Sequence, residues 1–241
     1  MQFLEDSKLI HFDEPSHKYT IGDQEFISAT TFIKSFSEGF DKDGSILKRC
    51  AAKENIPEAE LKARWAKKGE DAGVYGTFFH QCVEHFLNTG KIRKNEHYQT
   101  LSKFKDEVKF RGKVYSEVVL FDKDLGISGT SDLVQIIDNK IVQVHDIKTN
   151  EKPPTDYSFG RRMMRPVSHL NDSKLSHYFL QISLYLYLLS SKYGYSIGPN
   201  NYIFWLNRKK EQLERIKVEL KLTEVVDMIG CFMYAKANKN A

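Results

Sequence analysis

Two aspartates and a lysine within a short stretch of the chain could do chemistry together. Asp132 is followed fourteen residues later by the triplet Asp146-Ile147-Lys148. The run KIVQVHDIK alternates in polarity, which predicts a strand with Val144, Asp146 and Lys148 on one face. A carboxylate and an ammonium at the end of an otherwise apolar face are costly to bury alone. A metal ion held by both aspartates, with Lys148 beside it, would offset that cost.

Phosphodiester hydrolysis is the chemistry that these residue types suit. It needs an activated water, stabilised charge on the phosphate and help for the leaving oxygen, and one or two divalent cations can supply all three. Asp132 and Asp146 offer hard oxygen ligands for Mg²⁺ or Mn²⁺, and the main-chain carbonyl of Ile147 could add a third oxygen. Lys148 could orient the water and offset phosphate charge, and metal ions nearby would favour its neutral form as a partial base. The alternative is two acids at strand ends without a catalytic role.

Further motifs accompany these residues in a fixed order along the chain. In sequence they are Gly76-Thr77-Phe78-Phe79-His80, Glu117 within YSEVVLF, Gly129-Thr130-Ser131-Asp132, Asp146-Ile147-Lys148 and Gln181-Ile182-Ser183-Leu184-Tyr185. This order resembles the GTxxH, acidic-strand, GxxD, DxK and QxxxY motifs of the PD-(D/E)xK nuclease superfamily, in its RecB-like exonuclease branch. The stretch HFDEPSHKYTIGDQEFISATTFI is also similar to the opening of phage and mitochondrial genome maintenance exonucleases. The resemblance spans about residues 10–190.

The resemblance implies roles for four residues outside the central triplet. It makes His80 a nitrogen ligand of the metal, and Glu117 a ligand of a second metal or a residue that holds another ligand in place. It places Gln181 and Tyr185 in the catalytic site, where they contact the DNA backbone or brace the other residues. The alternatives are a packed or surface histidine at position 80, and a glutamine and tyrosine that only cover the sheet. Glu84 lies one helical turn after His80 and could support it.

Basic residues in two segments are candidates for contact with DNA phosphates. The first segment, residues 150–172, has no clear period and is predicted to be a long loop. The candidate residues are Arg161, Arg162 and Arg165 in this loop, and Arg208, Lys209 and Lys210 near the end of a later strand. Phe159, Met163 and Met164 in the loop could stack against an unpaired base. The alternatives are a solvated charged surface, and apolar residues that pin the loop to the core.

Composition sets the class of protein and its compartment. The 241 residues hold 36 Lys and Arg against 32 Asp and Glu, so DNA binding would need local clusters of charge. The three cysteines, at positions 50, 82 and 231, cannot supply the four ligands of an iron-sulfur cluster, and their odd number indicates a reducing, cytoplasmic compartment. The acidic amino terminus predicts no targeting peptide, and no apolar run is long enough for a membrane span.

Periodicity and turn residues predict an α/β fold, with a central mixed sheet of about five strands flanked by helices and a restriction-endonuclease-like core. Pro57 is expected at the start of one helix, and Gly69 at its end. The predicted elements are a hairpin at 8–30, helices at 44–54, 57–68, 71–89 and 97–111, strands at 114–121, 127–137 and 140–148, a helix at 173–192, strands at 201–207 and 214–221, and a helix from Thr223.

These elements predict one nuclease domain over residues 1–241. Its parts are an amino-terminal hairpin and extension at 1–43, a helical region at 44–111, a catalytic core at 112–222 and a carboxy-terminal helix at 223–241. The predicted function is a Mg²⁺- or Mn²⁺-dependent DNA exonuclease in recombination, repair or replication, and a phage-encoded enzyme fits this setting. Its partners would be single-stranded DNA or duplex with an end, and a recombination or replication protein. The alternatives are an endonuclease of a defence or recombination system, and a nucleic-acid-binding module without activity.

Overall fold

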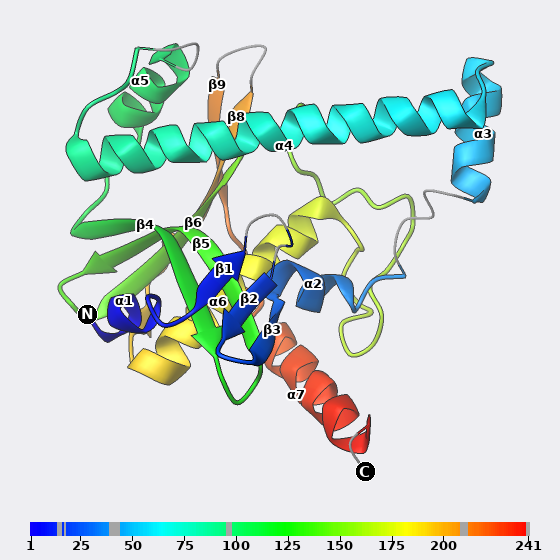
Figure 1. Cartoon of the computed structure of the whole chain (residues 1–241). Coiled ribbons are helices and arrows are strands. Elements are labelled where there is room, and N and C mark those ends of the chain that lie inside the picture. Colours follow the sequence, from blue (N-terminus) through cyan, green and yellow to red (C-terminus); the bar gives the residue numbers. More distant parts are fainter. Residues whose placement is uncertain (14–15, 17, 39–43, 95–97, 208–211, 240–241) are drawn as a thin grey trace.

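A mixed β-sheet with helices on both faces forms the centre of the molecule (Figure 1). The computed structural model describes residues 1–13, 16, 18–38, 44–94, 98–207 and 212–239. Within these residues the sheet has nine strands, so the predicted fold class is confirmed but the predicted number of about five strands is too low. The difference arises because the amino-terminal hairpin joins the sheet: β3 pairs in parallel with β5 through Ile27–Ile127 and Ser28–Ser128.

The strand order is β1-β2-β3-β5-β6-β8-β9, with β4 also paired to β5 and β7 to β6. The predicted meander is confirmed, because β4, β5 and β6 pair antiparallel in succession. The strands are β1 His11–Asp13, β2 Lys18–Ile21, β3 Gln24–Ser28, β4 Lys113–Asp122, β5 Ile127–Ile137, β6 Ile141–Lys148, β7 Ser196–Ile197, β8 Tyr202–Asn207 and β9 Gln212–Lys217.

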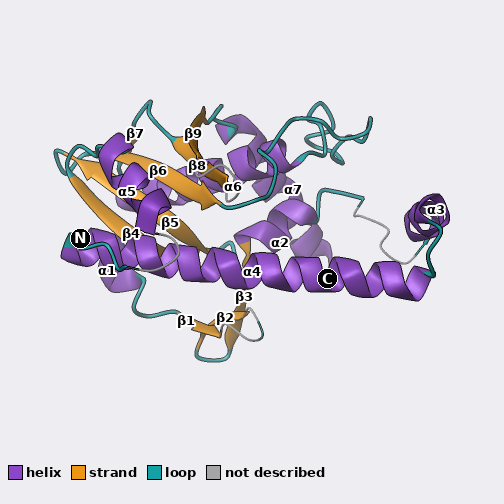
Figure 2. Cartoon of the chain, turned by 90° about the horizontal axis from the view of Figure 1, so that it is seen from above, coloured by secondary structure: helices purple, strands orange, loops and turns teal. Residues whose placement is uncertain are grey.

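Helices cover the two faces of the sheet with separate apolar clusters. Val144 of β6 packs with α2, α6 and α7 on one face, whereas Ile147 packs with α4 and α5 on the other, as the alternation predicted. Figure 2 shows α4 running along the molecule, with the hairpin strands β1, β2 and β3 on one side of it and β6, β8, β9 and α6 on the other. The helices are α1 Gln2–Asp6, α2 Ala29–Lys34, α3 Ser45–Glu54, α4 Glu58–Thr89, α5 Tyr98–Glu107, α6 Lys174–Tyr193 and α7 Leu222–Lys239. Among the described residues, no helix is both long enough and apolar enough to cross a membrane.

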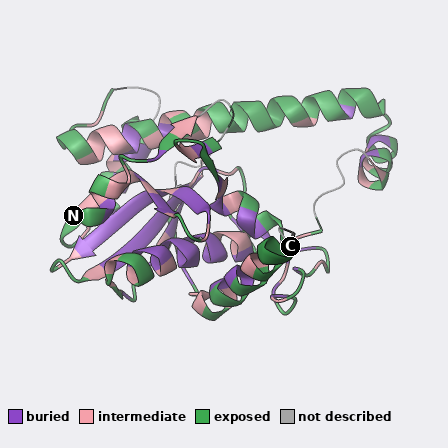
Figure 3. Ribbon diagram, turned by 60° about the horizontal axis from the view of Figure 1, so that its bottom comes forward, coloured by how far each residue is buried: buried purple, intermediate pink, exposed green. Residues whose placement is uncertain are grey.

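Helix α4 corrects one prediction, because the two helices expected at 57–68 and 71–89 are one helix of 32 residues. Gly69 does not end a helix, since a single glycine costs a helix interior only about 1 kcal/mol relative to alanine. The helix ends instead at Gly90, whose φ of 69° is the left-handed conformation of a C-cap. The amino-terminal half of α4 is mostly exposed, and α3 packs on it through Leu47 and Leu61 (Figure 3).

The edge of β5 that faces β3 and β6 is interrupted near its middle. Its pairing with β6 ends at Leu133–His145, and its pairing with β3 covers only Ile127 and Ser128. In the described chain, the segment from Gly129 to Asp132 therefore has no strand partner on this edge. A gap of this kind leaves room for side chains and ligands to approach the backbone. Two of the predicted motifs, GxxD and DxK, end beside it.

Candidate active site

Three acidic residues come from adjacent positions of three neighbouring strands. The β4–β5 register pairs Val118 with Ser131, which places Glu117 of β4 opposite Asp132 of β5. Asp146 lies on β6 one residue beyond the last β5–β6 pair. Both aspartates are buried, at 9% and 3% exposure. The interrupted sheet thus brings together residues that are far apart in the sequence.

Glu117 has a strained backbone at this point of the sheet. Its φ is +50°, a left-handed conformation that costs a non-glycine residue about 1–3 kcal/mol. The strand alternation reverses there, because Tyr115 and Val118, three residues apart, both pack against the core on the α6 side. The reversal turns the Glu117 carboxylate towards His80 of α4. Strain of this kind is typical of residues held in place for a function.

His80 stands among the carboxylates from the opposite side of the site. Its Nδ1 lies 3.2 Å from Glu117 Oε1 and 3.7 Å from Asp132 Oδ1. Its Nε2 lies 3.2 Å from the main-chain oxygen of Ile147. One ligand atom from each of His80, Glu117 and Asp132 fits within 4.8 Å of the others, which is a separation that one metal ion can bridge. The Ile147 carbonyl, predicted as a further ligand, borders the same space.

The charges around His80 show how strongly the site attracts a cation. Burial by itself would lower the pKa of the His80 imidazole, but the carboxylates of Asp132 and Glu117 outweigh it and raise the pKa to about 9. Without a metal, therefore, a proton on His80 offsets the two carboxylates. A divalent cation bound by the same atoms would replace that proton. The imidazole and carboxylate atoms of this cluster could hold a metal ion.

The second oxygen of Asp132 holds the two strands in their separated arrangement. Asp132 Oδ2 accepts a hydrogen bond of 2.6 Å from the backbone N–H of Ile147. This bond takes the place of the backbone pairing that β6 loses where it leaves β5. The other oxygen, Oδ1, remains directed at His80. Asp132 therefore has a fixed orientation before any ligand binds.

Asp146 and Lys148 form a buried ion pair beside the cluster. Lys148 Nζ lies 2.6 Å from Asp146 Oδ2 and 4.8 Å from the centre of the Tyr178 ring. Burial raises the pKa of Asp146 to about 6 despite the opposing effect of Lys148. Burial would lower the pKa of Lys148, but Asp146 and Asp132 outweigh it and raise the pKa above its ordinary value. Without a bound metal these carboxylates favour the ammonium form of Lys148, and its role as a partial base beside bound metal ions stays a prediction.

Helix α6 provides the side of the site that covers the gap in the sheet. Gln181 and Tyr185 are both buried, and Gln181 Nε2 donates to Tyr185 Oη at 3.2 Å. Burial keeps the pKa of Tyr185 well above its ordinary value, so its hydroxyl stays a hydrogen donor. A Cβ at Gly129 would lie only 2.7 Å from Tyr185 Oη, so the glycine of the GxxD motif is what allows this approach. Gln181 and Tyr185 thus line the same pocket as His80 and Glu117, and Tyr185 also belongs to the core.

Tyr178 is a site residue that the sequence did not reveal. It lies on α6 three residues before Gln181 and seven before Tyr185, which is the spacing of one helical face. Its ring contacts Lys148, and its hydroxyl donates to Asn150 Oδ1 at 3.3 Å. The helical spacing alone could have suggested it.

A pocket of about 710 Å³ lies beside His80 and Glu117, two of the three residues of the candidate metal cluster. Helix α4 lines it with His80 and Glu84, and β4 and α6 line it with Glu117, Gln181 and Tyr185. The amino-terminal hairpin closes another side, where Tyr19 Oη is 2.9 Å from Thr130 Oγ1. The pocket is large enough to hold a nucleotide next to the cluster.

The predicted phosphate-contacting arginines have different surroundings. Arg161 lines a second pocket of about 1240 Å³ between α4 and the 150–172 loop. The guanidinium of Arg162 donates to the main-chain oxygen of His169 at 2.9 Å, and Arg165 is exposed. Arg208, Lys209 and Lys210 lie outside the described residues. Of the apolar loop residues, Met163 is buried, whereas Phe159 and Met164 are exposed at 82% and 41%.

Comparison with known proteins gives only distant similarities. No model of a known family matches the chain, and no curated protein matches it. One similar crystal structure is that of SSO0001, with 15% identity, a TM-score of 0.40 and coverage of 97% of this chain and 84% of that one. Another is named "Putative exonuclease" and comes from Eubacterium rectale, with 13% identity, a TM-score of 0.47 and coverage of 89% and 80%. At this distance, function has to be inferred from the residues of the site.

Proposed function

We propose that this chain is a DNA exonuclease that depends on Mg²⁺ or Mn²⁺. The observation that carries the proposal is the cluster of His80, Glu117 and Asp132, whose ligand atoms come within 4.8 Å of one another from three separate elements. The buried pair of Asp146 and Lys148 lies next to it. The strain at Glu117 and the close approach at Gly129 support a site that is built for a ligand.

The residues of the site would divide the work of phosphodiester hydrolysis. A bound divalent cation supplies a Lewis acid and an activated water. His80, Glu117 and Asp132 would hold it, and Asp146 and the Ile147 carbonyl could provide further oxygen ligands. The Lys148 ammonium stabilises negative charge on the phosphate and positions the attacking water. Gln181 and Tyr185 donate hydrogen bonds to the DNA backbone from α6.

The whole described chain would act as one nuclease domain. The hairpin of residues 1–43 pairs with the core through β3, and α4 of the helical region 44–111 brings His80 to strands of the core 112–222. The helix of residues 223–241 packs against α6 through the shared apolar core. Each part therefore contributes either a site residue or support for one. An intracellular setting is part of this proposal and rests on the odd number of cysteines in the sequence.

The position of α4 supports an exonuclease over an endonuclease. This helix lines both pockets, with Ala72 shared between them, so a bound strand would lie under it and next to the 150–172 loop. If a strand has to be threaded under α4, only DNA with an end can reach the metal. The test uses 5′- and 3′-labelled linear DNA and closed circular single strands, with Mn²⁺ or excess EDTA.

We expect progressive loss of label from linear DNA with Mn²⁺, no cleavage in EDTA, and persistence of closed circles. Asp132→Asn should be inactive while it retains the wild-type circular dichroism spectrum. Rapid cutting of closed circles would instead identify the endonuclease, and DNA binding without cleavage in any metal would identify the inactive binding module. Full activity in EDTA would contradict the metal site. The labels also decide polarity, and the same assay with RNA decides tolerance for the 2′-hydroxyl. A recombination or replication protein is the expected partner in the cell.

A further inference from the structure

Two aromatic side chains are displayed on the surface of the 150–172 loop. Tyr157 is 69% exposed and Phe159 is 82% exposed. Their ring centres lie 4.6 Å apart, and the ring planes are inclined by 59°. Single exposed apolar residues are ordinary, but a contacting pair of rings in the solvent is a typical recognition surface.

The loop holds these rings in a defined place. Asp156, the residue before Tyr157, accepts hydrogen bonds from Ser173 at 2.8 Å, Ser176 at 3.0 Å and Asn171 at 2.6 Å. Burial acts to raise the pKa of Asp156, but these bonds outweigh it and lower the pKa, so the carboxylate stays charged and bonded.

The residue between the two rings is anchored as well. Ser158 is buried, its hydroxyl donates to the Arg161 carbonyl at 2.7 Å, and the Arg161 N–H donates to the Ser158 carbonyl at 3.1 Å. Phe159 follows with a φ of +55°, a conformation that costs a residue of its type about 1–3 kcal/mol. The anchored backbone thus keeps Phe159 in the solvent at a cost in strain.

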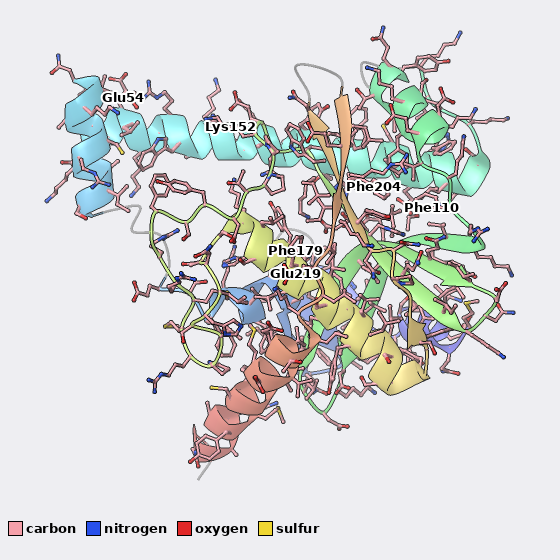
Figure 4. All side chains as sticks on the ribbon, turned by 180° about the vertical axis from the view of Figure 1, so that it is seen from behind. Glu54, Phe110, Lys152, Phe179, Phe204 and Glu219 are labelled. Carbon is pink, nitrogen blue, oxygen red and sulfur yellow. The ribbon has the colours of Figure 1, made fainter. Side chains whose placement is uncertain are left out.

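Basic residues surround the rings. Tyr157 and Phe159 line the second pocket, of about 1240 Å³, whose other wall is the exposed half of α4. Figure 4 shows Lys152 of the loop beside this helix. The lining holds three acidic residues against six basic ones, which are Arg64, Lys67, Lys68, Lys152, Arg161 and Lys174. Lys68 pairs with Glu151 at 2.7 Å and Arg64 pairs with Glu54, but both pairs are exposed and can exchange for phosphate contacts.

We propose that the second pocket binds an unpaired stretch of a polynucleotide, with bases stacked on Phe159 and Tyr157 and phosphates on the basic residues of α4 and the loop. Exposed aromatic rings suit unpaired bases, whose faces are open, and basic residues suit the backbone between them. Ala72 lines both this pocket and the one beside His80 and Glu117, so the two pockets meet at this residue of α4, and a strand held here would lie near the proposed cleavage site. This inference rests on the proposed nuclease function for its biological meaning, but the binding can be measured without hydrolysis.

The test measures binding of three fluorescent probes in excess EDTA, where the proposed hydrolysis stops. The probes are a dT strand of about ten nucleotides, an abasic strand of the same length, which has phosphates without bases, and a blunt duplex. The variant is Tyr157→Ala with Phe159→Asn, because asparagine removes the ring and still tolerates a positive φ. Tyr234→Ala on α7 is the matched control, since this tyrosine is 74% exposed but is not part of the pocket.

Wild-type protein should bind dT at least about five-fold more tightly than the abasic strand, which is the lower end for loss of one base–aromatic stack. The double variant should lose this preference and keep its affinity for the abasic strand and the duplex, and Tyr234→Ala should match the wild type. A variant that keeps the preference, or that weakens all three probes equally, would overturn the stacking site. If no metal supports cleavage but the base preference is intact, the nuclease proposal is contradicted and the stacking site is not. If cleavage occurs without a base preference, the stacking site is contradicted and the nuclease proposal is not.

Discussion

Binding of a divalent cation at the cluster should release about one proton from His80. Asp132 and Glu117 raise the pKa of this imidazole to about 9 in the metal-free protein, but a metal ligand has to be neutral imidazole. The metal therefore has to displace a proton at every pH below about 9. This predicts a pH dependence with a definite sign: metal affinity rises as the pH rises.

The magnitude follows from the two pKa values at the site. At about pH 7.5 the imidazole is about 97% protonated, whereas Asp146, with a pKa of about 6, is about 97% ionised. One proton per metal ion is then released, nearly all of it from His80. The apparent Kd of the metal should fall about ten-fold for each pH unit, or about 100-fold between pH 6.5 and pH 8.5. Below about pH 6 protonation of Asp146 should weaken binding further.

Isothermal titration calorimetry of the metal-free protein with Mn²⁺, in two buffers of different ionisation enthalpy, measures the number of protons directly. His80→Gln should bind more weakly and release almost no proton at about pH 7.5. Gln81→Ala is the matched control, since Gln81 lines the same pocket, carries no charge and does not belong to the cluster, and it should behave as the wild type. A wild-type protein that releases no proton would refute the reasoning, and so would a His80→Gln variant that releases one.

Three further outcomes are expected. Lys148→Ala should lower single-turnover cleavage at saturating Mn²⁺ at least about 100-fold, because a positive charge beside the phosphate is lost; near wild-type cleavage would remove Lys148 from the catalytic set. Burial lowers the pKa of His145 from 6.5 to about 3, so below about pH 6.5 the unfolded chain binds a proton that the folded chain excludes. The free energy of unfolding, measured with urea in EDTA, should therefore fall as the pH decreases, by up to about 1.4 kcal/mol per pH unit. The slope should be smaller in His145→Gln, and equal slopes in the two proteins would exclude the burial of His145 as the cause. Gly129→Ala places a Cβ 2.7 Å from Tyr185 Oη and should destabilise by about 1–3 kcal/mol, whereas Gly73→Ala, in open space on α4, should not destabilise; equal Tm values for the two variants would contradict the close approach.

Local sequence patterns were sufficient for most of the elements. Alternation predicted β5 and β6 and the faces of Val144 and Ile147, because the side-chain period of a strand is a property of the chain itself. The helix predicted at 173–192 corresponds to α6, whose N-cap Ser173 accepts a hydrogen bond from the backbone N–H of Ser176. At Gly69 the local signal was misleading, since a glycine permits a helix end but does not require one. The continuity of α4 matters for function because the helix carries His80 and also lines both pockets.

The residue types of the site could be predicted, because the motifs name Glu117, Asp132, Asp146 and His80 one by one. Their assembly could not, since it depends on contacts between segments far apart in the chain. Only the tertiary structure shows the parallel pairing of β3 with β5, which together with the departure of β6 leaves the gap at the GxxD motif. Only the tertiary structure shows that the strand alternation reverses at Glu117 and turns the Glu117 carboxylate towards His80.

The charge states were decided by the tertiary structure as well. Without a bound metal, the buried carboxylates of Asp146 on the same strand and Asp132 on the neighbouring strand favour the ammonium form of Lys148. No periodic pattern in the sequence predicts that the Tyr157 and Phe159 side chains are exposed. The hydrogen bonds to Asp156 that fix the loop beside them come from residues up to 20 positions away in the sequence. The sequence by itself determined which chemical groups are present and which elements carry them. Long-range packing decided their distances and charges, because these depend on burial and on neighbours that no local pattern encodes.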